Sequence, residues 1–242
     1  MYRPQSGSGY CDMAPASEQR KAVLFDVDGT LVDTTYLHAV CWWQALLDHG
    51  HTVPMADIHH AIGMGSGELL SHLIGEDRDR SDDEALSAAH LTLYRRHWGE
   101  LRPLPGAADL LRRCAERGLQ VVLSSSASAE ELSVLRAALD ADDAIAEATT
   151  ADDAEHTKPA PDVLNAALER TGLSADRAVF VGDAVWDGHA AAKAGVRFFA
   201  VTCGGTPESD LRDSGAIEVF RDPADLLDRF DESELGRHAK LA

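Results

Sequence analysis

Short runs of consecutive apolar residues alternate with amphipathic stretches along most of the chain. The run KAVLFDV at 21–27 is apolar at successive positions, which is typical of a parallel strand buried on both faces. Similar runs occur at 119–126 and 177–184, and stretches such as 105–118, with apolar residues at helical spacing, lie between them. This alternation predicts an α/β fold in which helices cover both faces of a Rossmann-like parallel sheet.

The segment after the first predicted strand has a different pattern. Residues 35–103 contain several stretches with helical spacing of apolar residues and no convincing strand. One of these helices is expected to begin with a capping box formed by Ser81 and Glu84. We therefore predict an all-helical insert at 35–103 within a single core made of residues 21–34 and 104–242. Residues 1–20, which are polar and rich in Gly, Pro and Ser, are interpreted as a disordered leader.

Composition narrows the classes of partner. The chain has 41 acidic and 22 basic residues and a formal charge of −19, so nucleic acid is not an expected partner. No stretch approaches the roughly 18 consecutive apolar residues of a membrane helix, and no membrane association is expected. The four cysteines lack the spacing of a metal site or a disulfide framework, which favours reduced thiols and a cytoplasmic location. The oligomeric state is not determined by the pattern.

Polar side chains follow the predicted strands at the points where these strands end. Asp26 and Asp28 follow the first strand, Ser124–Ser126 end the second, and Asp183 and Asp187 follow a later one. Because ligands bind at the carboxyl ends of parallel strands, these groups and Lys158 are expected to meet in one pocket. Carboxylates about 4 Å apart repel each other by roughly 4 kcal/mol at an effective dielectric of about 20, and a hard divalent cation removes this repulsion. The expected cofactor is Mg²⁺.

Chemical roles follow from these residue types. Asp26, ionised at neutral pH, is placed as a nucleophile, and Asp28 can act as general acid and then as general base. Gly29 allows the turn between strand and loop and a close approach of backbone to phosphate. A strand-end serine and Lys158 would neutralise the oxygens of a transferring phosphoryl group.

Taken in order, DVDGT, the strand-end serine, KPAPD and GDAVWD resemble the motifs of the haloacid dehalogenase-like hydrolase superfamily. The resemblance extends from residue 21 to about 223 and is to the branch of phosphoglycolate phosphatase and β-phosphoglucomutase. It implies that residues 35–103 form a small helical cap that closes over the site and excludes water.

The resemblance also implies residue roles. Asp26 would be the nucleophile and a Mg²⁺ ligand, and Asp28 the acid/base, with its backbone carbonyl on the metal. Lys158 would face the phosphate. Asp183 would be a metal ligand, while Asp187 would bind the metal through water or orient Lys158.

The substrate-binding positions are less closely defined. Ser125 is favoured as the phosphate-binding hydroxyl, with Ser126 supplying its backbone N–H, but a slip of one residue would select Ser124. His38 lies twelve residues after the nucleophile, as in β-phosphoglucomutases. The resemblance places specificity in cap residues around Gly63 to Leu70, and Gly63 and Met64 are the predicted substrate-binding residues there.

Three other activities are weighed against hydrolysis. Asp28 argues against dehalogenation, because a halide leaves without needing a proton. The arginine with which the mutases bind a second phosphate would fall near Ser66, and no cation replaces it locally. We therefore predict an enzyme that hydrolyses a small phosphorylated metabolite through an aspartyl phosphate. A sugar phosphomutase, and a non-catalytic phosphoacceptor or phosphate-binding relative, remain alternatives, and the identity of the ester is open.

Overall fold

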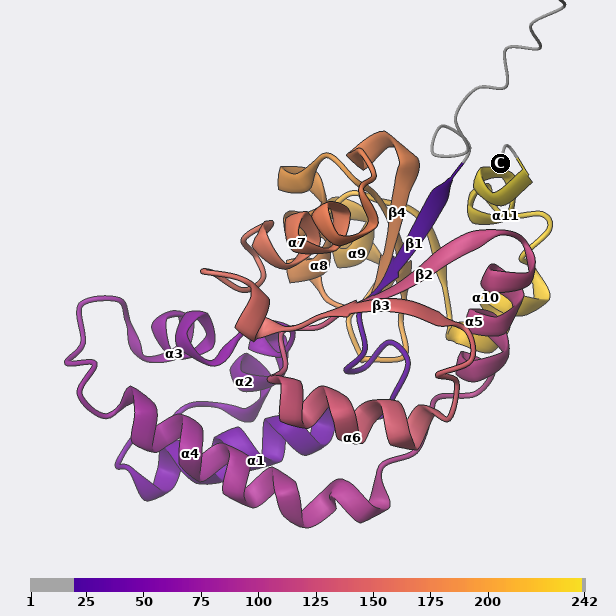
Figure 1. Ribbon diagram of the computed structural model, residues 1–242. Helices are drawn as coiled ribbons and strands as arrows, with labels where there is room; N and C mark the ends of the chain where they lie inside the picture. The colour runs from indigo at the N-terminus through magenta and orange to yellow at the C-terminus, as the bar shows by residue number, and fades with distance from the viewer. Residues whose placement is uncertain (1–19, 241–242) are drawn as a thin grey trace, which may run out of the picture.

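Six parallel strands form one sheet at the centre of the molecule (Figure 1). The computed structural model describes residues 20–240, so the predicted disordered leader lies outside the described residues except for Arg20. The strand order is β3-β2-β1-β4-β5-β6. The strands are β1 (Lys21–Phe25), β2 (Leu119–Ser124), β3 (Ile145–Thr149), β4 (Ala178–Gly182), β5 (Arg197–Val201) and β6 (Ala216–Phe220).

Alternate residues of β1 belong to two different hydrophobic layers. Val23 and Phe25 pack in the layer that includes residues of α5, α6, α10 and α11, whereas Ala22 and Leu24 pack with residues of α7, α8 and α9. All five residues of the strand are buried, as its unbroken apolar run predicts. The predicted Rossmann-like α/β core is confirmed. The α-helices are α1 (Thr35–Asp48), α2 (Met55–Ala61), α3 (Ser66–Ile74), α4 (Asp83–Tyr94), α5 (Ala107–Glu116), α6 (Ala129–Leu139), α7 (Asp162–Thr171), α8 (Val185–Ala194), α9 (Glu208–Asp213), α10 (Pro223–Asp228) and α11 (Glu234–Lys240).

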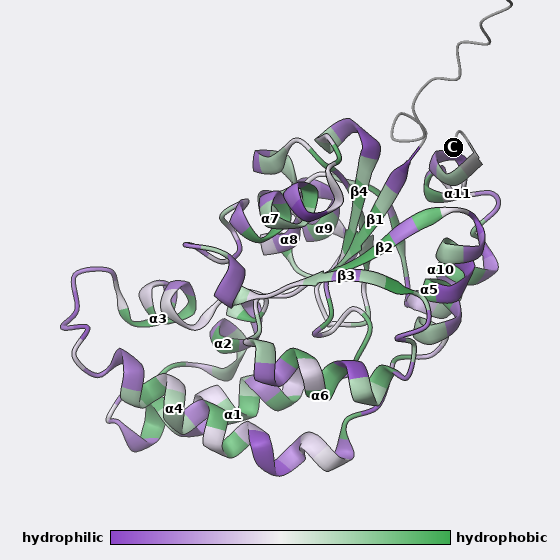
Figure 2. Cartoon of the chain, viewed as in Figure 1, coloured by the Kyte–Doolittle hydropathy of each residue, from purple (hydrophilic) through white to green (hydrophobic). Residues whose placement is uncertain are grey.

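Helices α1–α4 lie between β1 and β2 in the chain and form a separate body beside the sheet (Figure 1). They have their own apolar cluster, in which Trp42, Leu46, Ile58 and Leu86 are buried. Figure 2 shows hydrophobic residues along the strands, and hydrophobic and hydrophilic residues alternating along the helices of both bodies. All four helices fall within 35–103, and we retain this range as the proposed cap.

The start of α4 differs from the prediction. Asp82 occupies the N-cap position and makes no capping hydrogen bond, so the predicted Ser81–Glu84 capping box is wrong. The backbone N–H of Ser81 instead donates to Asp79 at 2.9 Å. Ser81 therefore belongs to a local Asx turn with Asp79 and does not cap the helix.

The two chain segments that connect the cap to the core pair with each other. The N–H of Leu104 donates to the carbonyl of Leu31 at 2.8 Å, and the N–H of Asp33 donates to Arg102 at 3.1 Å. Farther along the interface, the Trp186 indole N–H donates to the carbonyl of His60 at 2.7 Å. Within residues 20–240, no helix combines the length and the apolar character needed to cross a membrane.

Candidate active site

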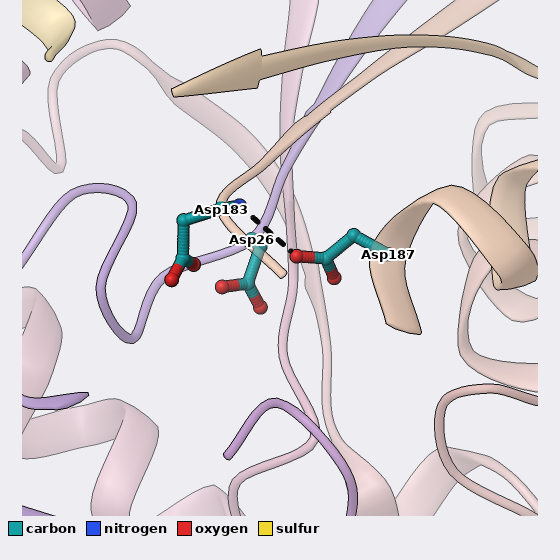
Figure 3. A group of neighbouring side chains, drawn as sticks. All are labelled: Asp26, Asp183 and Asp187. Carbon is teal, nitrogen blue, oxygen red and sulfur yellow. Dashed lines mark hydrogen bonds between the residues drawn. The ribbon is translucent and has the colours of Figure 1, made fainter. Parts of the chain in front are cut away.

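Three carboxylates meet at the carboxyl ends of β1 and β4. Asp26 follows β1, and its backbone N–H donates to Val181 of β4 at 2.9 Å. Asp183 follows β4, and Asp187 lies in the first turn of α8. One oxygen from each of Asp26, Asp183 and Asp187 lies within 4.8 Å of the other two, and Figure 3 shows Asp187 reaching toward the other two residues. The predicted convergence of these three residues is present in the structure.

Asp187 is held by donors on both of its oxygens. Its Oδ2 accepts the backbone N–H groups of Asp183 at 3.1 Å and Ala184 at 3.0 Å, the first of which is drawn in Figure 3. Its Oδ1 accepts from Lys158 Nζ at 2.9 Å. The start of a helix offers free N–H groups, so this carboxylate also satisfies the helix terminus. Asp187 therefore links the turn after β4 to the lysine.

Lys158 is fully buried and pairs with two carboxylates. Its Nζ donates to Asp26 Oδ1 and to Asp187 Oδ1. Burial alone lowers the pKa of Lys158, but Asp187 and Asp26 outweigh burial and raise the pKa above its ordinary value. The side chain is therefore a fixed ammonium beneath Asp26.

The cluster contains more negative charge than Lys158 neutralises. Burial raises the pKa of Asp26 to about 7, and the charges of Asp187 and Asp28 add to this against the effect of Lys158. Burial, followed by the charges of Asp26 and Asp187, raises the pKa of Asp183 well above its usual range. Buried oxygen ligands that are short of positive charge fit a hard divalent cation.

Thr30 and Gly29 shape the turn beside these carboxylates. The Thr30 hydroxyl donates to Asp183 Oδ1 at 2.9 Å and lies 3.3 Å from Asp26 Oδ2. Gly29 has a φ of +80°, and a Cβ there would lie 2.6 Å from Asp183 Oδ2, so the turn requires glycine. Thr30 was not among the predicted site residues, although its place as the last residue of DVDGT was the available signal.

Asp28 takes no part in the group of three carboxylates and lines a cavity between core and cap. Its Oδ1 accepts from Thr34 Oγ1 at 2.7 Å and lies 3.3 Å from His38 Nε2. Burial acts to raise the pKa of Asp28, but the contacts with His38 and Thr34 together outweigh burial, so the pKa is lowered. The first two acids of the motif therefore have different environments, although one residue separates them.

A second histidine, His90 of α4, contacts the side of the His38 ring that faces away from Asp28. His38 Nδ1 lies 3.1 Å from His90 Nε2, and the His90 ring stacks on Trp42 with centroids 4.2 Å apart. Burial lowers the pKa of His90 well below its ordinary value, so the ring is neutral. No motif pointed to His90, because its role depends on the approach of α4 to α1.

The three strand-end serines have different environments. The Ser124 hydroxyl is buried and lies 3.3 Å from Thr149 Oγ1 on β3. The Ser125 hydroxyl is also buried and accepts the backbone N–H of Ala127 at 3.0 Å. The Ser126 hydroxyl donates to the carbonyl of Gly63 in the cap at 3.3 Å.

The cavity above Asp26 and Asp28 has a volume of about 490 Å³. Of the predicted substrate-binding residues, His38, Gly63, Met64 and Ser126 line it. Gly29 does not, and Ser125 and Lys158 lie beneath the surface of the cavity. Thr157, which was not among the predicted site residues, also lines the cavity.

Comparison with known proteins identifies the family. A profile described as haloacid dehalogenase-like hydrolase matches residues 20–195. The chain belongs to this family.

Individual relatives within the family cover nearly the same length. A phosphoglycolate phosphatase from Rhodospirillum rubrum is 30% identical, over 86% of this chain and 90% of the relative. An N-acetylmuramic acid 6-phosphate phosphatase from Pseudomonas aeruginosa is 27% identical, over 88% of this chain and 96% of the relative. The crystal structure of a hydrolase from Pseudomonas syringae superposes with a TM-score of 0.83 at 32% identity, over 88% and 98% of the two chains.

These relatives confirm the predicted haloacid dehalogenase-like phosphatase, an enzyme whose α/β core carries a helical cap. The two named phosphatases differ in the ester that their names specify although they are similarly related to this chain. The substrate therefore has to be sought in the residues of the cavity.

Proposed function

We propose that the protein hydrolyses a small phosphate monoester with the help of Mg²⁺, through a phosphorylated Asp26. The observation that carries the proposal is the position of Asp26, which lines the cavity while its Oδ1 is paired with the fully buried Lys158. A carboxylate at the base of a cavity, with an ammonium beneath it, suits attack on an anionic phosphoryl group.

Asp26, Asp183 and the backbone carbonyl of Asp28 are the proposed Mg²⁺ ligands. The raised pKa values of Asp26 and Asp183 support a cation here, because bound positive charge would stabilise both ionised carboxylates. When bound, the ion would supply positive charge to the phosphate oxygens and keep Asp26 ionised. Asp187 has donors on both oxygens, which favours a role in orienting Lys158 over direct ligation.

The chemistry divides into two displacements at phosphorus. An oxygen of Asp26 bonds to phosphorus while the bond to the leaving oxygen breaks, and Asp28 gives a proton to that oxygen. Water then attacks phosphorus, the bond to Asp26 breaks, and Asp28 takes a proton from the water. Lys158 and the backbone N–H of Ser126 neutralise the phosphoryl oxygens in both steps.

Asp28 suits both proton transfers because its state depends on the bound anion. Without substrate its pKa is lowered, so the carboxylate is ionised and ready to act as a base. A phosphate dianion beside it raises that pKa, since a like charge favours the neutral acid. Substrate binding is therefore expected to protonate Asp28, which then gives this proton to the leaving alcohol.

Ser125 is the proposed phosphate-binding hydroxyl. The Ser124 hydroxyl is engaged with Thr149 inside the sheet, whereas Ser125 lies in the turn that follows β2.

The proposed location of the protein is the cytoplasm. Cys41, Cys114 and Cys203 are free thiols, which supports this location.

Hydrolysis is favoured over the mutase and over a non-catalytic role. Ser66, where the mutase arginine would fall, presents a hydroxyl to the cavity. Asp28 is presented to the cavity with two supporting side chains, and a protein that only accepts or binds phosphate has no need of it.

A turnover assay tests the proposal. Protein freed of metal by chelation is mixed with excess p-nitrophenyl phosphate, with and without Mg²⁺, and released phosphate is followed over many equivalents. Continuous Mg²⁺-dependent release supports hydrolysis. Stoichiometric labelling without turnover would identify a phosphoacceptor, and an absence of both labelling and turnover would contradict any phosphoryl-transfer role.

A further inference from the structure

One side of the cavity is acidic. Glu68 of α3, Glu84 of α4 and Glu131 of α6 line it together, and we call this group the acidic wall. Glutamate carries a negative charge at neutral pH. The three residues come from three different helices, two in the cap and one in the core, so both bodies contribute negative charge to the cavity.

Within residues 20–240 no lysine or arginine pairs with the acidic wall, and the basic group beside it is the exposed His156, whose Nδ1 lies 3.9 Å from Glu68 Oε1. Glu68 accepts from the hydroxyl of Thr157 at 2.6 Å, and Glu131 accepts from Ser128, the N-cap of α6. Glu84 lies exposed in the first turn of α4, and no Lys or Arg forms an ion pair with any of the three. The hydroxyls of Thr157 and Ser128 hold the carboxylates of Glu68 and Glu131 in place without cancelling their charge.

The other residues of the cavity do not offset the wall either. Among the lining residues that the structure describes there is no lysine or arginine, and Lys158 is buried beneath Asp26. An anionic group placed here would meet three carboxylates and no cation beyond those that serve the phosphoryl group. A carboxylate or a second phosphate on the substrate is therefore opposed by electrostatic repulsion.

The remaining lining is suited to a hydroxylated carbon chain. Ser66 and Ser87 add hydroxyl side chains to the lining, and carboxylates are strong acceptors for the hydroxyls of a ligand. Trp42 and Leu91 supply apolar surface for the carbon skeleton.

The size of the cavity also favours a leaving group larger than that of phosphoglycolate. Phosphoglycolate would occupy roughly 270 Å³ if each of its heavy atoms took about 30 Å³, the share of a water molecule. The cavity measures about 490 Å³, which leaves room for a longer leaving group. Filling this space would remove more apolar surface from water than a two-carbon acid can.

We propose that the acidic wall selects phosphate monoesters whose leaving group is an uncharged polyhydroxy alcohol, such as a sugar or a polyol, and rejects leaving groups that carry a carboxylate or a second phosphate. The proposal rests on the phosphatase activity proposed above. It separates this chain from relatives that are named for phosphoglycolate, whose leaving group is an acid.

Matched esters test the selection. The wild-type protein is assayed with saturating Mg²⁺ on glycerol phosphate against 3-phosphoglycerate, and on glucose 6-phosphate against 6-phosphogluconate, with phosphoglycolate added to the panel. In each pair we expect kcat/KM to be at least about tenfold higher for the uncharged leaving group. The ratio should fall as salt is added, because the repulsion is screened.

The outcomes separate this proposal from the one on which it rests. Turnover with equal or greater kcat/KM for the acidic esters overturns the selection and leaves the phosphatase intact. Failure to hydrolyse any ester, p-nitrophenyl phosphate included, overturns both.

A pair of charge variants locates the effect. Glu84→Lys is expected to improve kcat/KM for 6-phosphogluconate relative to glucose 6-phosphate by roughly threefold or more. Glu76→Lys makes the same change at an exposed cap residue that does not line the cavity, and it should leave this ratio unchanged. An unchanged ratio in Glu84→Lys, or the same change in both variants, overturns the role of the wall.

Discussion

The base of the cavity and its walls are held in different ways. At the base, Asp26 and Asp183 follow directly from buried strands, and Asp187 is fixed by two backbone N–H groups and Lys158. The walls come from helices and loops of two separate bodies, which meet through single contacts such as that of Gly65 with Thr157. Rigid strand ends suit a fixed chemical step, whereas contacts between two bodies can change with the substrate.

Charge distinguishes the same two regions. The base has a buried ammonium among its carboxylates and still lacks positive charge, whereas the acidic wall pairs with no lysine or arginine among the residues described. We infer that the base attracts a metal ion and a phosphate while the wall excludes further anions. The comparison predicts that changes at the base abolish chemistry and that changes at the walls alter selection or closure.

The largest effect is expected for Asp26→Asn. Loss of the nucleophile should lower kcat by at least about 10⁴-fold, measured with p-nitrophenyl phosphate. The folded state should not be weakened, because the change removes one charge from a crowded, buried cluster. Asp33→Asn, at an exposed residue of the same loop, is the control and should keep wild-type activity. Undiminished turnover in Asp26→Asn would refute the assignment of the nucleophile.

Lys158→Met tests whether the base is held by charge pairing. Removing the ammonium leaves Asp26 and Asp187 without their shared partner, and the free energy of unfolding in EDTA should fall by about 3 kcal/mol. Urea denaturation measures the change. Lys193→Met removes an exposed lysine and should alter the unfolding free energy by less than about 0.5 kcal/mol. Equal midpoints for Lys158→Met and wild type would show that the pairing does not stabilise the base.

Metal binding should depend on pH near neutrality. Because burial raises the pKa of Asp26 to about 7, the metal-free carboxylate is protonated below that pH and ionised above it. A cation binds the ionised form, so Mg²⁺ affinity should weaken by at least about fivefold between pH 7 and pH 6, and the raised pKa of Asp183 adds to this loss. Titration calorimetry at pH 8, 7 and 6 measures this dependence, and a constant affinity over that range would contradict it.

The smallest effect is expected at the contact between cap and core. Thr157→Val removes the hydroxyl that accepts from Gly65 at 3.0 Å and donates to Glu68 at 2.6 Å. With the Gly65 N–H left unpaired, the closed cap should be weakened by about 1 kcal/mol, and KM should rise several-fold with little change in kcat. Thr92→Val, at an exposed position of α4, should have no effect on either constant. A fall in kcat alone would place Thr157 in the chemistry and not in closure.

The base of the site was more predictable from sequence than its walls. The four residues before Asp26, Ala22–Phe25, are all apolar because β1 is buried on both faces, and the motif residues follow the strand ends directly. Local pattern is enough for such residues, since their positions depend on a single strand and the turn after it. The three-carboxylate group and the Rossmann-like core follow from that pattern.

The walls depend on contacts between distant segments, which a single sequence does not reveal. Thr157 meets Gly65 across 92 residues, and His38 meets His90 across 52. Within the insert, helical spacing predicts helices at 35–50, 66–75 and 81–101 but not the short helix α2, MADIHHA, because its polar residues obscure a periodicity that only Ile58 and Ala61 express through burial. At Ser81, an Asx turn competed with the capping pattern and replaced it.

The paired segments that join cap and core have a consequence for how such a molecule can diversify. Because Leu104 donates to Leu31 and Asp33 donates to Arg102 across the junction, the two ends of the insertion stay next to each other whatever the intervening polypeptide does. A lengthened, shortened or exchanged insertion would leave the strand beneath it in register. Recombination at this junction could thus supply new recognition surfaces to an unchanged reaction centre.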